Sequence, residues 1–460
     1  MNLRNSISAI LVLAAASISL YAEEMEIGFF SDGYLYKHTL NPALGNDRNY
    51  VAIPIFGNLQ VGVSGNVGIT DFLYIKDGRT VTFLNDKVGT QEFTDQIKDK
   101  NRLMVDAAVT LLSSGFKGFG GYNTISLSAQ IQSGITMPGE LLRVMKEGIG
   151  NQTYTVEGTG LHATSFLELA LGHSRQWNEK LRVGAKVKFL LGIANMDAKV
   201  SQGYLTLGEN GYEGLMDAEV HGNVKGLYYK TTDEWRGPDK DHLHTYVNDL
   251  DVDGEGPGGF GLALDLGADY RLNEDWRFDA SLSDIGFIRW NTDQVASTGG
   301  PRVVNTDSFL FNVDDDADNS FDRELDRLAE SLCTLYELQD MGDQGARTTA
   351  LHATMRLAAE YTFPLYRRLT FGLMNTTRFA GDYGWTDFRL SANVAPTGWF
   401  SATAAFSEGS FGPSFGWLLN FHPKAFNFFI GMDHASFKVA KQGVPLGNQY
   451  DVNLGINVSF

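Results

Sequence analysis

The chain of 460 residues is poor in several things that stabilise or anchor other exported proteins. It has a single cysteine, Cys333, so no intrachain disulfide can form. Beyond its first 22 residues it has no apolar run of about 20 residues, which excludes membrane-spanning helices. Basic residues are fewer than acidic ones, 37 against 55, and the formal net charge of −18 argues against nucleic acid as a partner.

The first 22 residues have the pattern of a secretory signal peptide. Arg4 is followed by an apolar, small-residue stretch from Ser6 to Leu20, and Ala22 precedes Glu23. We expect cleavage after Ala22, although Leu20 is larger than the small residue usual at that position. The apolar stretch is too short for a membrane-anchoring helix, so export is the better interpretation.

The last eleven residues alternate apolar and polar side chains without interruption. The apolar face carries Tyr450, Val452, Leu454, Ile456, Val458 and Phe460, and the polar face carries Asp451, Asn453, Gly455, Asn457 and Ser459. Lipid covers such an apolar face in a transmembrane β-barrel, whereas a soluble protein rarely leaves it bare. A strand ending in Phe460 resembles the closing strand and sorting signal of bacterial outer-membrane barrels. We therefore expect Phe460 to take part in membrane insertion.

The same period of two recurs along the chain and predicts fourteen long strands. They are expected near residues 58–69, 102–113, 121–134, 161–174, 181–193, 260–272, 276–288, 350–363, 368–380, 386–395, 398–408, 411–421, 425–434 and 450–460. Every second connection is short, as in barrels whose short turns face the periplasm, and an even count closes the sheet without a free edge. Sixteen strands result if Met196–Leu207 and Leu215–Val224 join the wall, but we interpret these two segments as an extracellular hairpin.

The predicted fold class is therefore all-β, a transmembrane antiparallel barrel. Residues 1–22 form the signal peptide, residues 23–57 are long enough to fold into the lumen as a plug, and residues 58–460 form the barrel. Extracellular insertions are expected near 194–259 and 289–349.

The second insertion contains a predicted helix. Its apolar residues follow a four-three-four-three spacing: Phe321, Leu325, Leu328, Leu332 and Leu335. Asn319 or Ser320 can cap its start. We expect the apolar stripe to pack over the loop crown, with a partner-binding helix as the alternative.

Charged residues fall on the polar faces of the predicted strands and are expected to point into the lumen. They are Glu168, Arg182, Lys186, Lys188, Asp265, Asp269, Arg356, Glu360 and Arg389. Opposite charges on neighbouring strands can satisfy one another, so we favour a structural role in supporting the plug over a solute path.

Five tryptophans fall near predicted strand ends, where interfacial aromatic girdles lie. They are Trp177, Trp276, Trp290, Trp385 and Trp399. Trp417 falls in the middle of a predicted strand and does not fit such a girdle.

Two glycine-containing motifs match enzyme patterns but stand in the wrong context. Residues 412–416 match the G-x-S-x-G nucleophile pattern around Ser414, which requires a sharp strand-to-helix turn and here falls within a predicted strand. Residues 254–259 contain G-x-G-x-x-G before a strand, so no helix end is available to hold a phosphate. We therefore do not expect an enzyme.

Possible metal ligands lie in the acidic loops. Asp249, Asp251 and Asp253 precede Gly254 as in the first half of a calcium loop, but Phe260 stands where its closing glutamate belongs. The alternatives are a loop Ca²⁺ site and a solvated acidic loop. Asp314, Asp316 and Asp318 repeat the spacing without the glycine. His242 and His244 can share one face of an extended segment, but no third ligand is identifiable. No other cofactor is expected.

Asn41-Pro42-Ala43, followed by fourteen alternating segments, resembles the long-chain fatty-acid transporter (FadL-like) superfamily. The stretches NPALGNDRNYVAIPIFGNLQVGVSGNVGITDFLY, GFGLALDLGADYRLNEDW and ASLSDIGFIRW look closer to an uncharacterised outer-membrane subgroup related to PorV-like accessory proteins of type IX secretion. The resemblance implies a fourteen-stranded barrel with an N-terminal hatch that carries the NPA motif.

The resemblance also implies a bacterial outer-membrane location and contact with membrane lipid and the barrel-assembly machinery. The leading functional hypothesis is transport of a small hydrophobic solute through the plugged barrel. The alternatives are an accessory barrel that binds secreted or surface proteins and, with little support, an outer-membrane hydrolase. Fold-level analogy alone cannot decide among them.

Overall fold

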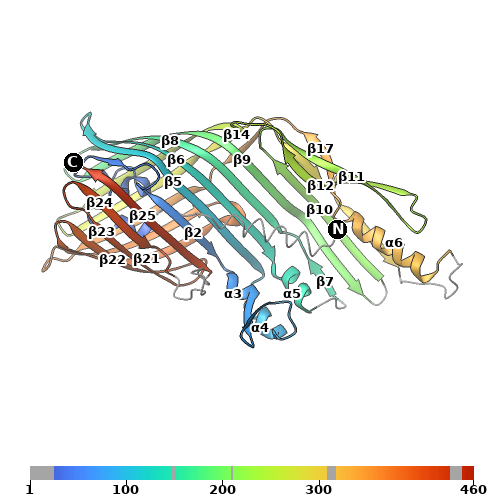
Figure 1. The fold of residues 1–460 in the computed structure, drawn as a ribbon. Helices are drawn as coiled ribbons and strands as arrows, with labels where there is room; N and C mark the ends of the chain where they lie inside the picture. Colours follow the sequence, from blue (N-terminus) through green and yellow to red (C-terminus); the bar gives the residue numbers. More distant parts are fainter. Residues whose placement is uncertain (1–24, 148–151, 209–210, 308–317, 436–447) are drawn as a thin grey trace.

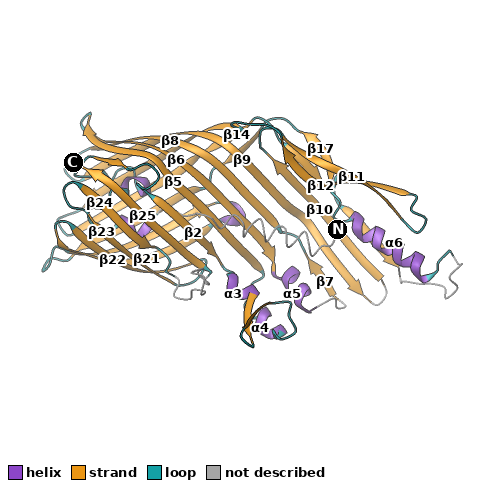
Figure 2. Cartoon of the chain, viewed as in Figure 1, coloured by secondary structure: helices purple, strands orange, loops and turns teal. Residues whose placement is uncertain are grey.

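The computed structural model describes residues 25–147, 152–208, 211–307, 318–435 and 448–460, so the expected signal peptide lies outside the described residues. Fourteen antiparallel strands of this part of the chain close into a ring (Figures 1 and 2). In ring order they are β2 (Leu59–Gly65), β5 (Lys100–Gly118), β6 (Gly121–Pro138), β8 (Gly160–Gln176), β9 (Leu181–Gly208), β13 (Gly259–Arg271), β14 (Trp276–Trp290), β19 (Ala353–Thr362), β20 (Leu369–Phe379), β21 (Trp385–Thr397), β22 (Phe400–Gly409), β23 (Ser414–Phe421), β24 (Phe426–Met432) and β25 (Gln449–Ser459).

The last strand closes the ring. β25 pairs with β24 on one side and with β2 on the other, where Leu454 lies opposite Leu59. The predicted fold class and strand count are therefore confirmed. Among the described residues, no helix has the length and apolar character needed to cross a membrane.

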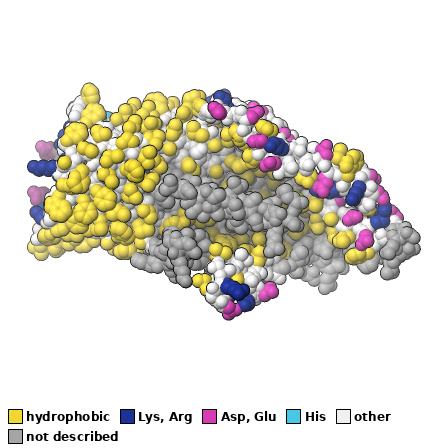
Figure 3. All heavy atoms as spheres, viewed as in Figure 1, with side chains coloured by type: hydrophobic (Ala, Val, Ile, Leu, Met, Phe, Trp, Pro, Cys, Tyr) yellow, Lys and Arg dark blue, Asp and Glu magenta, His cyan; other side chains and the backbone are white. Residues whose placement is uncertain are grey.

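The barrel is apolar outside and polar inside. In β21, Phe388 and Leu390 are about 60% exposed, whereas Arg389 between them is 1% exposed. The same alternation holds in β25, where Val452, Ile456 and Val458 are exposed and Asp451, Asn453 and Asn457 are buried. Figure 3 shows the outward side chains of β21 to β25 as a hydrophobic surface on this face of the barrel. Lipid is the solvent that suits such a surface.

The sheet continues beyond the ring at the end away from the short turns, which is called the outer end below. β13 pairs with β9 only as far as Gly192, and the remainder of β9 pairs with β10 (Gly211–Gly222). This hairpin lies outside the ring, which confirms fourteen strands rather than sixteen. Shorter strands extend it: β7 (Gln152–Thr155), β15 (Gln294–Ser297), β16 (Arg302–Asp307), β17 (Gln339–Asp343) and β18 (Arg347–Ala350).

Two further units occupy the outer end. The hairpin β11 (Leu227–Arg236) and β12 (His242–Val252) lies beside helix α6 (Phe321–Thr334), the helix that the apolar spacing predicts. The other unit comprises α3 (Ile69–Phe72), β3 (Leu73–Lys76), β4 (Arg79–Thr82), α4 (Thr90–Thr94) and α5 (Gly139–Glu147). It has its own small core, which includes Phe83, Phe93 and Leu142.

Residues 25–49 lie inside the ring and form the plug. They contain η1 (Glu26–Phe29) and α2 (Lys37–Leu40), and most of their side chains are buried. The wall begins earlier than the expected residue 58, because β1 (Tyr50–Ala52) pairs with both β5 and β25. The backbone of β1 thus belongs to the wall rather than to the plug.

The predicted tryptophan girdle is partly wrong. Trp177, Trp276 and Trp399 are exposed, but Trp290 and Trp385 are buried. In β14 the cause is an irregularity in the pairing with β13, at which Asp284 adopts φ 60°. An extra residue in a strand reverses the inward–outward alternation, so Phe287 faces outward and Trp290 inward. Trp385 simply shares the inward face with Asp387 and Arg389.

Candidate functional site: the plug and the cavity beside it

The NPA motif lies flat against two glycines of the wall. Gly184 of β9 and Gly267 of β13 are register partners. A Cβ atom on Gly184 would lie 2.1 Å from the Pro42 carbonyl oxygen, and one on Gly267 would lie 2.0 Å from Asn41 Oδ1. Only glycine permits so close an approach of the two backbones.

Asn41 fixes the motif by hydrogen bonds. Its Nδ2 donates to the Ala268 carbonyl at 3.1 Å and to Asp279 Oδ1 at 3.3 Å, and its Oδ1 accepts from the Ala43 backbone N–H at 2.9 Å. The side chain therefore bonds both the wall and its own turn, as asparagine does in Asx turns. Asn41, Pro42 and Ala43 thus lie at the wall contact of the plug.

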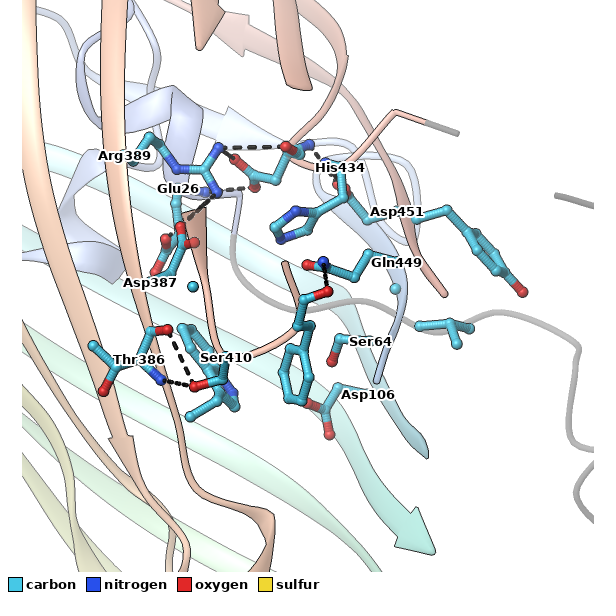
Figure 4. Close-up of a pocket in the computed structure, with 17 residues that line it drawn as sticks. Glu26, Ser64, Asp106, Thr386, Asp387, Arg389, Ser410, His434, Gln449 and Asp451 are labelled. Carbon is cyan, nitrogen blue, oxygen red and sulfur yellow. Dashed lines mark hydrogen bonds and ion pairs between the residues drawn. The ribbon is translucent and has the colours of Figure 1, made fainter. Parts of the chain in front are cut away.

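The start of the plug is held by a buried ionic cluster. The backbone N–H groups of Glu26 and Ile27 each donate to the Asp433 carboxylate at 2.7 Å. The Glu26 carboxylate lies 3.3 Å from Arg356 Nε and 3.7 Å from Arg389 Nη2. Arg389 also binds Asp433 at 2.8 Å (Figure 4). Removing one partner from such a cluster leaves an uncompensated buried charge, so the cluster fixes the plug firmly.

A cavity lies beside this cluster, at the outer ends of β2, β21, β22, β24 and β25. Its volume is ≈ 30 Å³, and it opens to the surrounding solvent. The charged and ionisable lining includes Glu26, Asp106, Asp387, Arg389, Asp433, His434 and Asp451 (Figure 4). The aromatic lining is Trp385 and Phe411, whereas Val63 and Tyr450, which also border the cavity, stand on the outward faces of β2 and β25. The cavity thus places an apolar wall next to the anchored start of the plug.

The remaining predicted lumen charges gather in two further clusters. Lys188 Nζ lies 2.6 Å from Asp284, 3.1 Å from Asp265 and 3.6 Å from Glu168, and Lys186 lies 3.5 Å from Asp265. Arg277 lies 2.9 Å from Asp269, 3.3 Å from Asp279 and 3.9 Å from Glu360. Arg182, which lies opposite Asp269 in the pairing of β9 with β13, donates to Ser174 Oγ at 2.9 Å. Opposite charges thus neutralise one another in the wall.

The structure adds charged residues that the strand patterns did not single out. Glu26 precedes every predicted strand. Asp433 follows β24 but lies within the predicted strand 425–434, in phase with its inward residues Asn427 and Phe429. Asp284 enters the lumen only because of the irregularity in β14. Arg277 and Asp279 could have been found, because they share one face of β14 with a spacing of two.

The plug also carries a buried histidine. His38 Nε2 lies 2.7 Å from Tyr50 Oη, which lies 2.8 Å from Ser113 Oγ in β5. Burial, and secondarily the charge of Lys186, lowers the pKa of His38 to about 3. The ring is therefore neutral while the plug is in place.

The possible metal ligands are spread along the outer hairpin. Asp249 and Asp251 lie in β12, where an extended strand keeps alternate carboxylates in a row, and Asp251 binds Lys230 at 2.7 Å. Asp253 follows the strand. Asp314 and Asp316 lie outside the described residues. In the described part of the chain no three His, Cys, Asp or Glu residues form a group that could hold a metal ion.

His242 and His244 contact α6 instead. His242 Nδ1 lies 2.7 Å from Glu330, and His244 lies 3.0 Å from Glu330 and 3.1 Å from Glu337. Burial lowers the pKa of His244, but its hydrogen bonds to these two carboxylates outweigh burial and raise the pKa above its ordinary value. The two histidines therefore join the hairpin to the helix.

Ser414 of the G-x-S-x-G motif has a histidine neighbour. Its Oγ lies 2.7 Å from His434 Nδ1 and 2.7 Å from Ser407 Oγ. Ser414 begins strand β23, so the strand-to-helix turn of nucleophilic serines is missing. Among the described residues no carboxylate lies within hydrogen-bonding distance of the His434 ring, so the pair lacks the third member of a triad.

Comparison with known proteins places the chain in a family. A family model described as "Family of unknown function (DUF5723)" matches residues 42–433. The predicted likeness to an uncharacterised family is therefore confirmed. No curated protein matches the sequence.

Solved structures similar to the chain include a transporter and a FadL homologue. The toluene transporter TodX of Pseudomonas putida has 11% sequence identity and a TM-score of 0.38, with 91% of each chain covered. A Pseudomonas aeruginosa FadL homologue has 10% identity and a TM-score of 0.37, covering 96% of this chain and 95% of its own. Because these TM-scores lie below 0.5, the closed ring of strand pairings alone establishes the barrel.

Proposed function

We propose that this chain, which belongs to the family of unknown function DUF5723, is an integral protein of the bacterial outer membrane that passes a small hydrophobic solute through its plugged lumen. The observation that carries the proposal is the cavity beside the plug. Its aromatic side chains, Trp385 and Phe411, suit an apolar solute, and its position makes the plug the next barrier inward.

The membrane part of the proposal rests on the surface. The outward faces of the ring carry exposed Leu, Phe, Ile and Val, while full charges are buried inside. In water, a protein is more stable with its charges outside and its apolar side chains inside. A bilayer favours the opposite arrangement, which is the one found here. Insertion by the barrel-assembly machinery then follows as the expected route of folding.

Passage requires the plug to shift. The plug core packs Ile27, Tyr34 and Tyr36 against wall residues such as Leu418 and Phe429. Tyr36 Oη also donates to Asn457 Oδ1 of β25 at 2.7 Å. These contacts hold the plug against the wall inward of the cavity, so the proposal has two steps: solute binding in the cavity and movement of the plug.

The test combines ligand retention with permeation. Native mass spectrometry of the detergent-purified protein should detect a bound apolar small molecule, and proteoliposomes should take up apolar solutes faster than protein-free liposomes. Trp385→Ala, which opens the cavity wall, should weaken both effects. Trp399→Ala, at an exposed position on the opposite rim, is the matched control. A barrel without bound ligand and with uptake equal to that of empty liposomes contradicts transport.

A second function, binding of secreted or surface proteins, has one observation in its favour. Phe321 and Leu325 of α6 are 44% and 47% exposed, so the apolar stripe of the helix is only half covered. An accessory barrel of the type IX secretion kind would use such a helix as an anchor. The same native mass spectra distinguish the two functions, because a protein subunit lost on Leu325→Ser, with no bound small molecule, favours the accessory role.

A further inference from the structure

The short turns of the barrel are basic in an otherwise acidic protein. Its six short connections and adjoining strand ends carry seven exposed basic residues: Lys117, Arg175, Lys180, Arg271, Arg367, Arg368 and Lys424. They carry three acidic residues, Glu179, Glu274 and Asp275. The whole chain has the opposite balance, with 55 acidic residues against 37 basic ones. Figure 3 shows Lys and Arg side chains at this end, interspersed with Asp and Glu, next to the hydrophobic surface.

Most of these cations have no acidic partner. Arg367 lies 3.0 Å from both Glu274 and Asp275, so this group is internally neutralised. Arg368 donates to the Pro396 carbonyl. In the described part of the chain no carboxylate lies within ion-pairing distance of the remaining basic side chains: Lys117, Arg175, Lys180, Arg271 and Lys424. These five residues, all exposed, are called the basic rim below.

Large apolar side chains accompany the basic rim. Phe119 stands two residues from Lys117 and is 85% exposed, and Trp177 stands two residues from Arg175 and is 74% exposed. Leu272 follows Arg271, and Phe426 stands two residues after Lys424; both are exposed. An aromatic or aliphatic group beside a cation is the combination that suits a lipid interface, where the apolar part enters the acyl region and the charge stays with the headgroups.

We propose that the basic rim binds the anionic phospholipid headgroups of the leaflet in which the short turns lie. The proposal rests on the proposed membrane location and adds to it a preferred lipid. Two features select lipid as the occupant. The rim is continuous with the hydrophobic surface, so a bilayer that covers this surface brings its headgroups to the rim. Its unpaired ammonium and guanidinium groups complement phosphate, and guanidinium can bind two phosphate oxygens at once.

The charge pattern also sets the orientation of the barrel. The rest of the chain is strongly acidic and would be repelled by an anionic leaflet, whereas the rim would be attracted to it. Binding is therefore expected at one end of the barrel only. It should weaken as ionic strength rises, because salt screens exposed charges over about 10 Å at 0.1 M.

The experiment compares two triple variants in nanodiscs with equal amounts of phosphatidylcholine and phosphatidylglycerol. The rim variant carries Lys117→Gln, Arg175→Gln and Lys424→Gln. The control variant removes the same charge from exposed positions of the outer half: Arg79→Gln, Lys98→Gln and Lys225→Gln. Native mass spectrometry of the released protein measures the ratio of retained anionic to zwitterionic lipid.

Wild type and control should retain phosphatidylglycerol preferentially, and the rim variant should lose this preference by about tenfold or more. Equal retention by the rim and control variants overturns the inference. Failure of the wild-type protein to enter any nanodisc would instead contradict the proposed membrane location. A rim variant that keeps its lipid preference but loses binding to another anionic partner also overturns the inference.

Discussion

Replacing Gly184 by alanine should loosen the plug while leaving the barrel closed. The new Cβ atom would lie 2.1 Å from the Pro42 carbonyl oxygen and 2.5 Å from the Ala43 backbone nitrogen. Both neighbours are backbone atoms, so they cannot rotate away as a side chain does. Overpacking of this kind costs about 1–3 kcal/mol. The wall retains its own strand pairing, because Gly184 keeps its backbone hydrogen-bonding groups.

The cost falls on the docked plug, so plug opening should become about 5- to 150-fold more frequent, since 1.4 kcal/mol corresponds to a factor of ten. Hydrogen exchange followed by mass spectrometry measures this opening directly. The informative amides are those of Ala43 and Leu44, which donate to Asn41 Oδ1 and to the Asn41 carbonyl, each at 2.9 Å.

Gly398→Ala is the matched control, because a Cβ atom at Gly398 would meet no atom within 4 Å. Exchange of the plug amides should be unchanged in this control and faster in Gly184→Ala, with the wall amides of β9 and β13 equally protected in both. Equal exchange of Ala43 and Leu44 in the two variants would refute the idea that the glycine pair seats the motif.

Three further predictions concern single charged or titratable groups. Glu26→Gln should weaken docking of the plug start by about 3–5 kcal/mol, because it leaves Arg356 and Arg389 undercompensated; unchanged exchange of the Ile27 amide would contradict this. His38 has a pKa of about 3 in the docked plug and about 6.5 when exposed. The docked plug therefore has its full stability with respect to this group above about pH 6.5 and loses about 1.4 kcal/mol of stability per pH unit as pH falls toward 3. His38→Gln should remove this pH dependence from the exchange of the plug amides. The raised pKa of His244 stabilises the contact with α6 below about pH 6.5, and this stabilisation is lost as pH rises through the raised value. Because the site lies near the surface, the loss should be at most about 1 kcal/mol, measured as faster exchange in α6 at alkaline pH and absent in His244→Gln.

The strand pattern predicted the wall well because each wall residue has only two environments, lipid and lumen. Leu262, Leu264 and Leu266 face outward and Asp265 is fully buried, as alternation requires. The pattern failed where the period was broken. Asp284 adds a residue to β14, so Trp290 became buried although its position at a strand end indicated the membrane interface.

The candidate site was only half visible in the sequence. Its lysines and arginines stood on regular strands, so their inward direction followed from the period of two. Their partner Glu26 stands in an irregular segment, whose direction no period describes, whereas Asp433 falls on the inward phase of the predicted strand 425–434. His242 and His244 suggested a metal site because their partner, Glu330, lies 88 and 86 positions away in the chain.

The sequence by itself predicted a barrel whose outer surface faces lipid. Three of its features are local or additive, so they can be read without knowing which strand pairs with which. They are the alternation in fourteen segments, the short turns between every second pair of strands, and the acidic net charge. Only the tertiary structure decided how the lumen is filled. The glycine pair that receives Asn41 and Pro42, the arginines that hold Glu26 and the cavity beside them come from strands far apart in the chain. Ring closure brings them together, because each contact depends on the register of the strands around the barrel.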